Sequence, residues 1–192
     1  MNRKLLGTAI VLASLAAVAA ACGEGRVIFN VDVFSWLGGS AKDTISYPGV
    51  PPFTPSTTIS NPAQKITLVP GLSSSGIDTV KVTGSVRVMN QTGGPGTLSF
   101  QVYLASDEAG TSGAGRDSLF RPAPTANLLP GSDTTVVLNV PNLSPSGNAL
   151  FNKSAVWIRL AVTVSNSGAA FMNGKAILTG LNLRVVVQDN IF

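Results

Sequence analysis

The chain has 192 residues, of which 44% are hydrophobic and only 11% are charged, a composition that argues against an intrinsically disordered protein. Its 13 basic residues outnumber its 9 acidic ones, but they are scattered singly, so we expect no nucleic-acid partner. The lack of histidine and the single cysteine exclude an internal disulfide, Ser-His-Asp and Cys-His catalysis and, in practice, a zinc site, and we expect no cofactor.

The first 21 residues have the three parts of a secretory signal peptide. Arg3 and Lys4 form a short positive region, residues 5–18 form an uncharged apolar stretch, and three alanines follow as residues 19–21. The apolar stretch is too short for a comfortable transmembrane helix. We therefore predict that residues 1–21 are a signal peptide.

The only cysteine, Cys22, follows directly. The string Val18-Ala19-Ala20-Ala21-Cys22 resembles the lipobox of bacterial lipoproteins, although Ala19 stands where leucine is usual. The resemblance implies that the Cys22 thiol carries lipid, that the chain is cut before it, and that residues 22–25 form a lipidated tether. Gly23 rather than aspartate follows, which by resemblance to the enterobacterial sorting rule implies the outer membrane more than the inner one. In the alternative interpretation, the signal is an ordinary secretory one and Cys22 is incidental.

From Arg26 onward, apolar and polar residues alternate with a period of two, the pattern of strands with one face in a core. The segments that show it most clearly are 27–33, 80–88, 98–104, 134–140, 156–164 and 181–187, and the weaker ones are 44–47 and 65–69. Gly93-Gly94-Pro95-Gly96 is a turn signal between two of them and predicts an antiparallel hairpin. We therefore predict an all-β fold, a single antiparallel β-sandwich over residues 26–192.

Two phrases resemble the immunoglobulin-like modules of bacterial surface proteins and of the water-stress LEA-14 type. They are Leu128-Leu129-Pro130-Gly131-Ser132-Asp133-Thr134-Thr135-Val136 and Val86-x-Val88-x-Asn90. The resemblance implies an immunoglobulin-like sandwich and no particular function.

Two long connections, residues 47–62 and 106–124, interrupt the strand pattern, and connections of this length are more often functional than structural. Phe53 lies in the first and Phe120 in the second, and the alternation places Trp157 on the outward face of a strand. Exposed aromatic rings can stack on a sugar or a partner, so these three are our candidate ligand-binding residues. In the alternative, a loop or the second sheet covers them.

The loop 106–124 also carries a weak candidate metal site. Asp107, Glu108 and Asp117 could offer oxygens to Ca²⁺, but their spacing matches no EF-hand pattern. In the alternative interpretation, these carboxylates are solvated charges of a loop and bind no metal ion. No catalytic constellation is identified, so we expect the protein not to be an enzyme.

These observations predict a lipoprotein of the cell envelope, held on a membrane through Cys22 and facing the periplasm or the surface, with a non-enzymatic structural or binding role. The alternative is a recognition module that uses loops 47–62 and 106–124, with another envelope protein or a polysaccharide as its partner. A small transmembrane β-barrel and an enzyme are more distant alternatives. Apolar residues alternating back from Phe192 would favour a barrel, but that alternation mostly fails.

Overall fold

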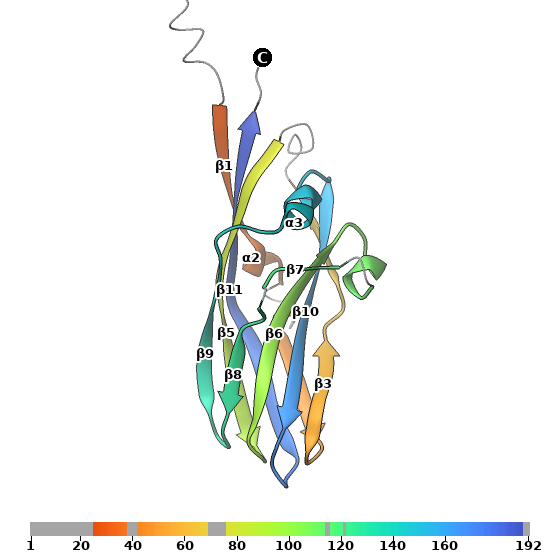
Figure 1. Ribbon diagram of the computed structural model, residues 1–192, viewed down its shortest axis with the longest axis vertical. Coiled ribbons are helices and arrows are strands. Elements are labelled where there is room, and N and C mark those ends of the chain that lie inside the picture. The colour runs from red at the N-terminus through yellow and green to blue at the C-terminus, as the bar shows by residue number, and fades with distance from the viewer. Residues whose placement is uncertain (1–24, 38–41, 69–75, 114–115, 121, 190–192) are drawn as a thin grey trace, which may run out of the picture.

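The computed structural model describes residues 25–37, 42–68, 76–113, 116–120 and 122–189, which form two antiparallel sheets packed face to face (Figure 1). The proposed signal peptide, Cys22 and most of its tether lie outside the described residues. The all-β, antiparallel two-sheet sandwich is therefore confirmed. In the part of the chain that the structure covers, no helix has the length and apolarity needed to cross a bilayer.

The first sheet is built on the long strand β11. It contains β1 (Gly25–Asp32), β2 (Thr44–Val50), β5 (Gly76–Thr92), β9 (Asp133–Val140) and β11 (Met172–Asp189). β5 pairs along one side of β11, while β2 and β1 share its other side one after the other. β9 pairs with the far side of β5 and forms an edge of the sheet.

The second sheet is built in the same way on β10. It contains β3 (Thr54–Ser60), β4 (Gln64–Thr67), β6 (Gly96–Ala105), β7 (Asp117–Ser118), β8 (Thr125–Leu128) and β10 (Ala155–Asn166). β3 and β4 share one side of β10, and β6 pairs along the other. The short helices are α2 (Val33–Leu37), η2 (Ala109–Thr111) and α3 (Pro145–Leu150).

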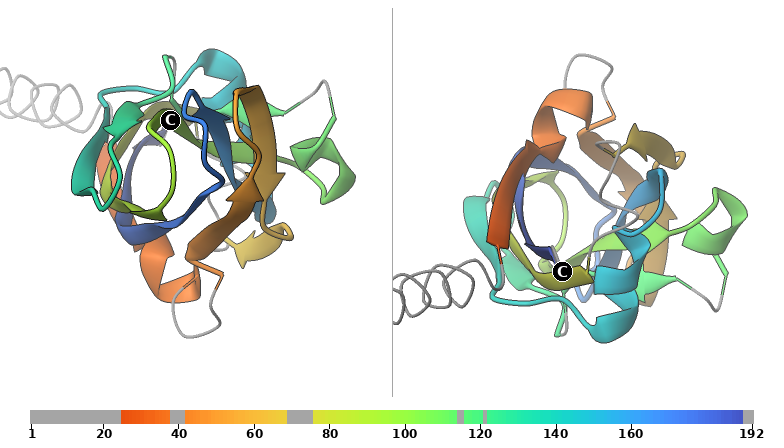
Figure 2. Two further views of the ribbon diagram at one scale, coloured as in Figure 1. Left: turned by 90° about the horizontal axis from the view of Figure 1, so that it is seen from below. Right: turned by 90° about the horizontal axis from the view of Figure 1, so that it is seen from above.

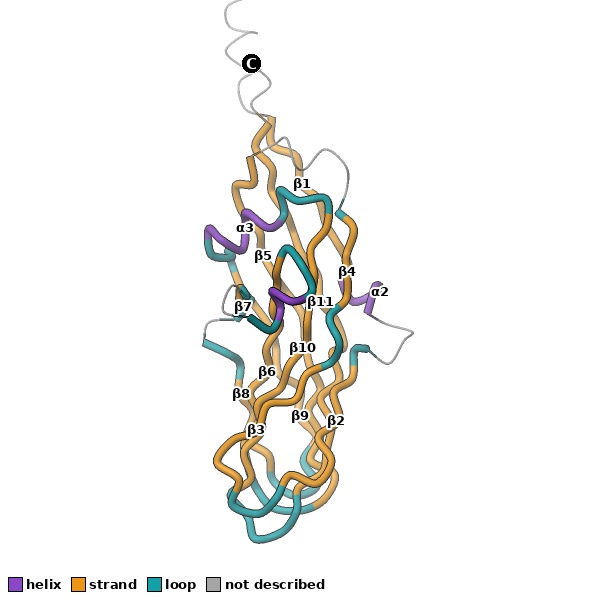
Figure 3. Tube along the Cα trace, turned by 90° about the vertical axis from the view of Figure 1, so that its right-hand side faces the viewer, coloured by secondary structure: helices purple, strands orange, loops and turns teal. Residues whose placement is uncertain are grey.

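Four short turns join strands that belong to different sheets. They connect β2 to β3, β5 to β6, β8 to β9 and β10 to β11, and all lie at the lower end of the molecule (Figures 1 and 3). Eight strands that cross between two sheets in this order make a jelly roll. The expected immunoglobulin-like order, in which several neighbouring strands pair within one sheet, is not found. The expected hairpin at Gly93–Gly96 is wrong for the same reason, because β5 and β6 lie in opposite sheets.

Figure 2 shows the two sheets from either end of the molecule, curving around a common interior. This interior is filled by the alternating apolar residues that the sequence pattern indicates. In β10, for example, every second residue from Val156 to Val164 is buried, and β5 buries Val80, Val82, Val86 and Val88. Phe100, Tyr47 and Phe151 are the largest of the fully buried side chains. The hydroxyl of Tyr47 donates to the carbonyl of Met89, and burial raises the pKa of this phenol.

The predicted long loop at residues 47–62 is wrong, because β2 and β3 occupy most of it. Pro48 lies within β2 and Pro55 within β3. Each strand is at the edge of its sheet, and proline is tolerated there because its missing N–H faces away from the ladder. The second loop, 106–124, is irregular over most of its described residues, with η2 and the two-residue strand β7 inside it.

Candidate functional site

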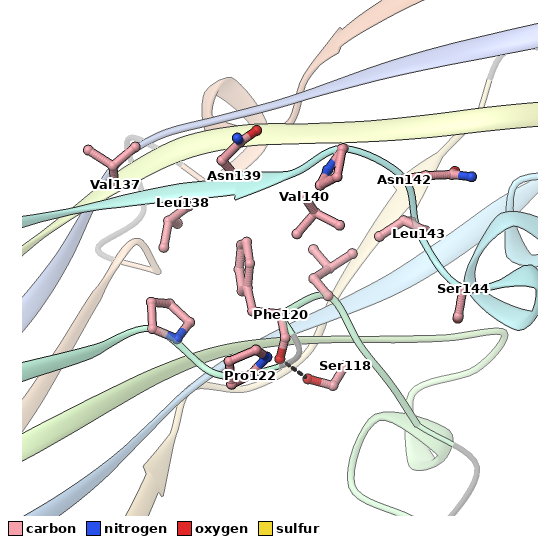
Figure 4. A pocket seen from close by; sticks show the side chains of 13 residues that line it. Ser118, Phe120, Pro122, Val137, Leu138, Asn139, Val140, Asn142, Leu143 and Ser144 are labelled. Carbon is pink, nitrogen blue, oxygen red and sulfur yellow. Dashed lines mark hydrogen bonds between the residues drawn. The ribbon is translucent and has the colours of Figure 1, made fainter.

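A groove opens along one side of the sandwich, between the edge strand β9 of the first sheet and residues 118–120, 122 and 124 on the side of the second sheet (Figure 4). Its volume is about 410 Å³. The residues that line it are Ser118, Leu119, Phe120, Pro122, Pro124, Val137, Leu138, Asn139, Val140, Pro141, Asn142, Leu143 and Ser144. The lining is thus mainly apolar, with a few hydroxyl and amide groups, as is usual for a binding site.

Phe120, one of the predicted ligand-binding residues, forms a wall of this groove. Its backbone carbonyl accepts hydrogen bonds from the Gln101 side chain at 2.7 Å and from the Ser118 hydroxyl at 3.1 Å. Figure 4 shows the Leu138 side chain directed toward the Phe120 ring from the opposite strand. Phe120 is only 3% exposed, so it shapes the groove and offers little free surface for stacking. The interpretation of Phe120 as a residue covered by its surroundings fits the geometry better.

The edge strand β9 forms the other wall. Leu138 is buried, whereas Val137 on the opposite face of the strand is 74% exposed. In an antiparallel sheet alternate residues of an edge strand direct their N–H and C=O groups away from the sheet. Within the described chain β9 pairs only with β5, and that pairing shows no register shift. The outer edge of β9 is therefore a straight row of backbone donors and acceptors beside an apolar groove.

The upper end of the groove is polar. Asp117 is 7% exposed and accepts hydrogen bonds from the hydroxyls of Ser144, at 2.6 Å, and Ser146, at 2.7 Å. Ser144 is also the N-cap of α3, because its hydroxyl accepts from the amide of Gly147. Asp117 therefore holds α3 against the end of the groove.

The structure does not assemble the candidate metal site. Asp107 and Glu108 are exposed, and a carboxylate oxygen of Asp107 accepts the amide of Gly110 at 2.6 Å. Asp117 instead accepts hydrogen bonds from Ser144 and Ser146 at the start of α3. Among the described residues, no group of three acidic, histidine or cysteine side chains could hold a metal ion.

The other two aromatic candidates lie far from the groove. Trp157 is half-buried on the outer face of the second sheet, between Lys65 and Ala105 in the register. Phe53 lies in the β2–β3 turn and is 71% exposed. The prediction treated the three aromatic residues as candidates for one binding function, whereas the fold places them in three separate regions.

Two further exposed apolar residues lie at the same end of the molecule as Phe53, and neither was among the predicted site residues. Leu129 in the β8–β9 turn and Phe171 in the β10–β11 turn are 66% and 59% exposed. We call the four crossing turns, residues 51–53, 93–95, 129–132 and 167–171, the tip. The signal that could have found it is one large apolar residue in each of three Pro- or Gly-containing turns.

No protein-family model matches the chain, and neither does any curated protein. Solved structures show a distant likeness. The infectious bursal disease virus Gt strain structure is 14% identical over 88% of this chain and 39% of that chain, with a TM-score of 0.48. PirA is 15% identical over 74% and 98%, with a TM-score of 0.33. TmCBM61 in complex with β-1,4-galactotriose is 9% identical over 83% and 86%, with a TM-score of 0.29. The chain spans about a third of the length of the Gx strain virus chain, 34%, and the likeness concerns the fold alone.

Proposed function

We propose that the protein is a lipid-anchored envelope protein without enzymatic activity, which binds an extended segment of a partner protein along β9. The segment adds to the first sheet as a further strand. Its alternate side chains enter the groove beside Phe120, Leu138 and Leu143. The observation that carries the proposal is the open edge of β9 next to an apolar groove.

Natural proteins usually protect such an edge, because an exposed strand pairs readily with another chain. The common protections are lysine, proline, bulges or a covering loop. The sequence of β9, Asp133-Thr-Thr-Val-Val-Leu-Asn-Val140, contains neither lysine nor proline, and its register is regular. Its β-branched residues favour an extended conformation. An edge with these properties is suited to strand addition, in which backbone hydrogen bonds give affinity and side-chain pockets give selectivity.

The anchor proposed at Cys22 is compatible with this binding mode. β1 begins at Gly25 at the upper end of the molecule, whereas β9, which forms one wall of the groove, runs along the side of the sandwich (Figure 1). A chain held through Cys22 would keep the β9 edge free of the membrane that holds it.

The test uses a fluorescent octapeptide of alternating threonine and valine, which has the strand pattern and no charge. Fluorescence anisotropy measures its binding, and hydrogen exchange measures protection of the β9 amides. We expect binding together with slower exchange in β9. Val137→Lys, which puts a charge on the edge, should abolish both, whereas the matched control Val137→Thr should retain them. Binding without protection of β9, or equal binding by Val137→Lys, would refute strand addition.

A further inference from the structure

The tip exposes apolar side chains at positions where the core does not use them. Phe53, Leu129 and Phe171 are exposed and belong to three different turns. These turns lie at one end of the molecule (Figures 1 and 3). Phe53 also has a φ of 54°, a left-handed conformation that is uncommon for a bulky residue. Such a conformation persists only where the surroundings hold it, and it collects at functional sites.

The tip is held by a dense set of hydrogen bonds between its turns. Asn166 is 1% exposed, and its amide group donates to the carbonyls of Val50, at 3.0 Å, Pro51, at 3.0 Å, and Ala170, at 2.8 Å. The amide of Phe53 donates to Gly168 at 3.2 Å. The exposed apolar side chains are thus displayed on a preorganised support.

Further hydrogen bonds within the tip satisfy other backbone groups. The amide of Ser132 donates to Leu129 and the amide of Ser167 donates to Pro95, both at 2.9 Å. The tip also contains prolines at positions that would otherwise carry N–H groups, namely Pro51, Pro52, Pro95 and Pro130. Backbone that enters lipid must have its polar groups satisfied within the protein, so these internal bonds and prolines lower the cost of placing the tip in lipid.

The absence of charge in the tip also favours contact with lipid. No residue of the tip carries a charge. Asp133, which follows the β8–β9 turn, is paired with Arg87 of the neighbouring strand. An uncharged end gains no electrostatic attraction from an anionic surface, and it has no charge to desolvate when it enters a neutral one.

We propose that the tip is a membrane-contact surface, in which Phe53, Leu129 and Phe171 insert into the interface of a bilayer of zwitterionic lipids. A protein partner would need hollows that match three projecting side chains, whereas lipid accommodates them without a matching shape. The three residues lie on separate turns at the same end of the molecule, so one lipid surface can receive all three. None of them lines the groove beside β9, so the insertion does not depend on strand addition.

If Cys22 carries a lipid anchor, as in the proposed function, the position of the tip decides which membrane it contacts. β11 begins at Met172 beside the tip and ends at Asp189, the register partner of Gly25. Its 18 residues span about 60 Å at about 3.3 Å per residue. The anchored membrane would lie near Gly25, so the tip would contact a different lipid surface.

The test uses residues 22–192 with Cys22→Ser, so that no acyl chain contributes; this chain keeps every described strand and the whole buried core. Flotation with phosphatidylcholine vesicles measures binding. We expect the protein to float equally in low salt and in about 0.5 M salt. The triple variant Phe53→Ser, Leu129→Ser and Phe171→Ser should lose at least about 100-fold in partitioning. Ile28→Ser, an exposed apolar residue on β1, is the matched control and should bind normally.

A second measurement reports insertion directly. In Phe53→Trp, brominated phosphatidylcholine should quench the new fluorescence, and the same protein without this substitution gives the background from Trp36 and Trp157. Unchanged flotation of the triple variant, binding only to anionic vesicles, or absence of quenching would overturn the proposal. So would a wild-type dimer in analytical ultracentrifugation that the triple variant lacks, because it would assign the tip to a second copy of the chain. Circular dichroism establishes that each variant is folded.

Discussion

Replacing Asn166 is the sharpest test of how the tip is held together. Its amide nitrogen donates to three carbonyls from two turns, and its oxygen accepts the amide of Gly168 at 3.0 Å. The residue is 1% exposed, so water does not readily replace these bonds. Asn166→Ala removes all of them and leaves backbone groups unsatisfied beneath the turns.

The expected loss follows from the cost of unsatisfied polar groups. A net hydrogen bond contributes about 1 kcal/mol, and a buried group left without a partner costs about 1–3 kcal/mol. Some of the freed carbonyls lie near the surface and will find water, so we expect Asn166→Ala to lower the free energy of unfolding by about 2–4 kcal/mol. For a domain of this size that corresponds to a fall in Tm of about 5–15 °C.

The isosteric variant Asn166→Asp separates the hydrogen bonds from packing. It places a carboxylate oxygen against three carbonyl oxygens, which disfavours the charged form and raises the pKa of the carboxyl in the folded state. Because the unfolded carboxyl has a pKa of about 4, the folded state binds the proton more tightly. The deficit relative to wild type should therefore be largest at neutral pH and shrink as the pH falls through the raised pKa.

Urea denaturation of residues 22–192 between neutral and acidic pH measures both effects. Asn127→Ala, an exposed asparagine on β8, is the matched control and should change the free energy of unfolding by less than about 0.5 kcal/mol. Equal stability of wild type and Asn166→Ala, or a deficit of Asn166→Asp that is independent of pH, would refute the argument that the donor holds the turns.

Three further predictions concern other parts of the chain. Cys22→Ser should abolish labelling by radioactive fatty acid; a wild-type protein without label would contradict acylation. Gly93→Ala should lower Tm by about 5–10 °C, because its Cβ would lie 1.8 Å from the carbonyl of Phe171 at a φ of 106°. Gly131→Ala, with a φ of 74° and open space around it, should lower Tm less. The pairing with Arg87 holds the pKa of Asp133 below its ordinary value, so the small stability difference between wild type and Asp133→Asn should be present above about pH 4 and vanish as the pH falls through the lowered pKa.

The strands themselves could be predicted from the sequence because burial of one face leaves a period of two. Val156 to Val164 in β10 and Val80 to Val88 in β5 show this plainly. The alternation identifies which face is buried but says nothing about which strand is the neighbour. Gly93–Pro95 is therefore equally compatible with a hairpin and with the crossing turn that the structure has. Edge strands with proline are harder to predict, because proline is normally taken as the end of a strand. The pattern predicts β2 only up to Tyr47, directly before Pro48, and it does not predict β3 at all.

The candidate site was harder to predict, because it depends on contacts between distant segments. Phe120 is close in sequence to charged and glycine residues, which suggests an exposed loop, yet it is covered from across the groove by Leu138 of β9 (Figure 4). The open edge of β9 depends on its being the last strand of its sheet, which only the topology reveals.

The crossing topology also explains why the tip exists. In the jelly-roll order the four turns β2–β3, β5–β6, β8–β9 and β10–β11 lie at one end, while the β9–β10 connection with α3 lies at the other (Figure 1). Asn166 therefore reaches the β2–β3 and β10–β11 turns at once. β1 and the end of β11 lie together at the opposite end. If the chain is attached to a membrane through its N-terminus, the uncharged apolar turns of the tip therefore lie at the end of the molecule farthest from that membrane.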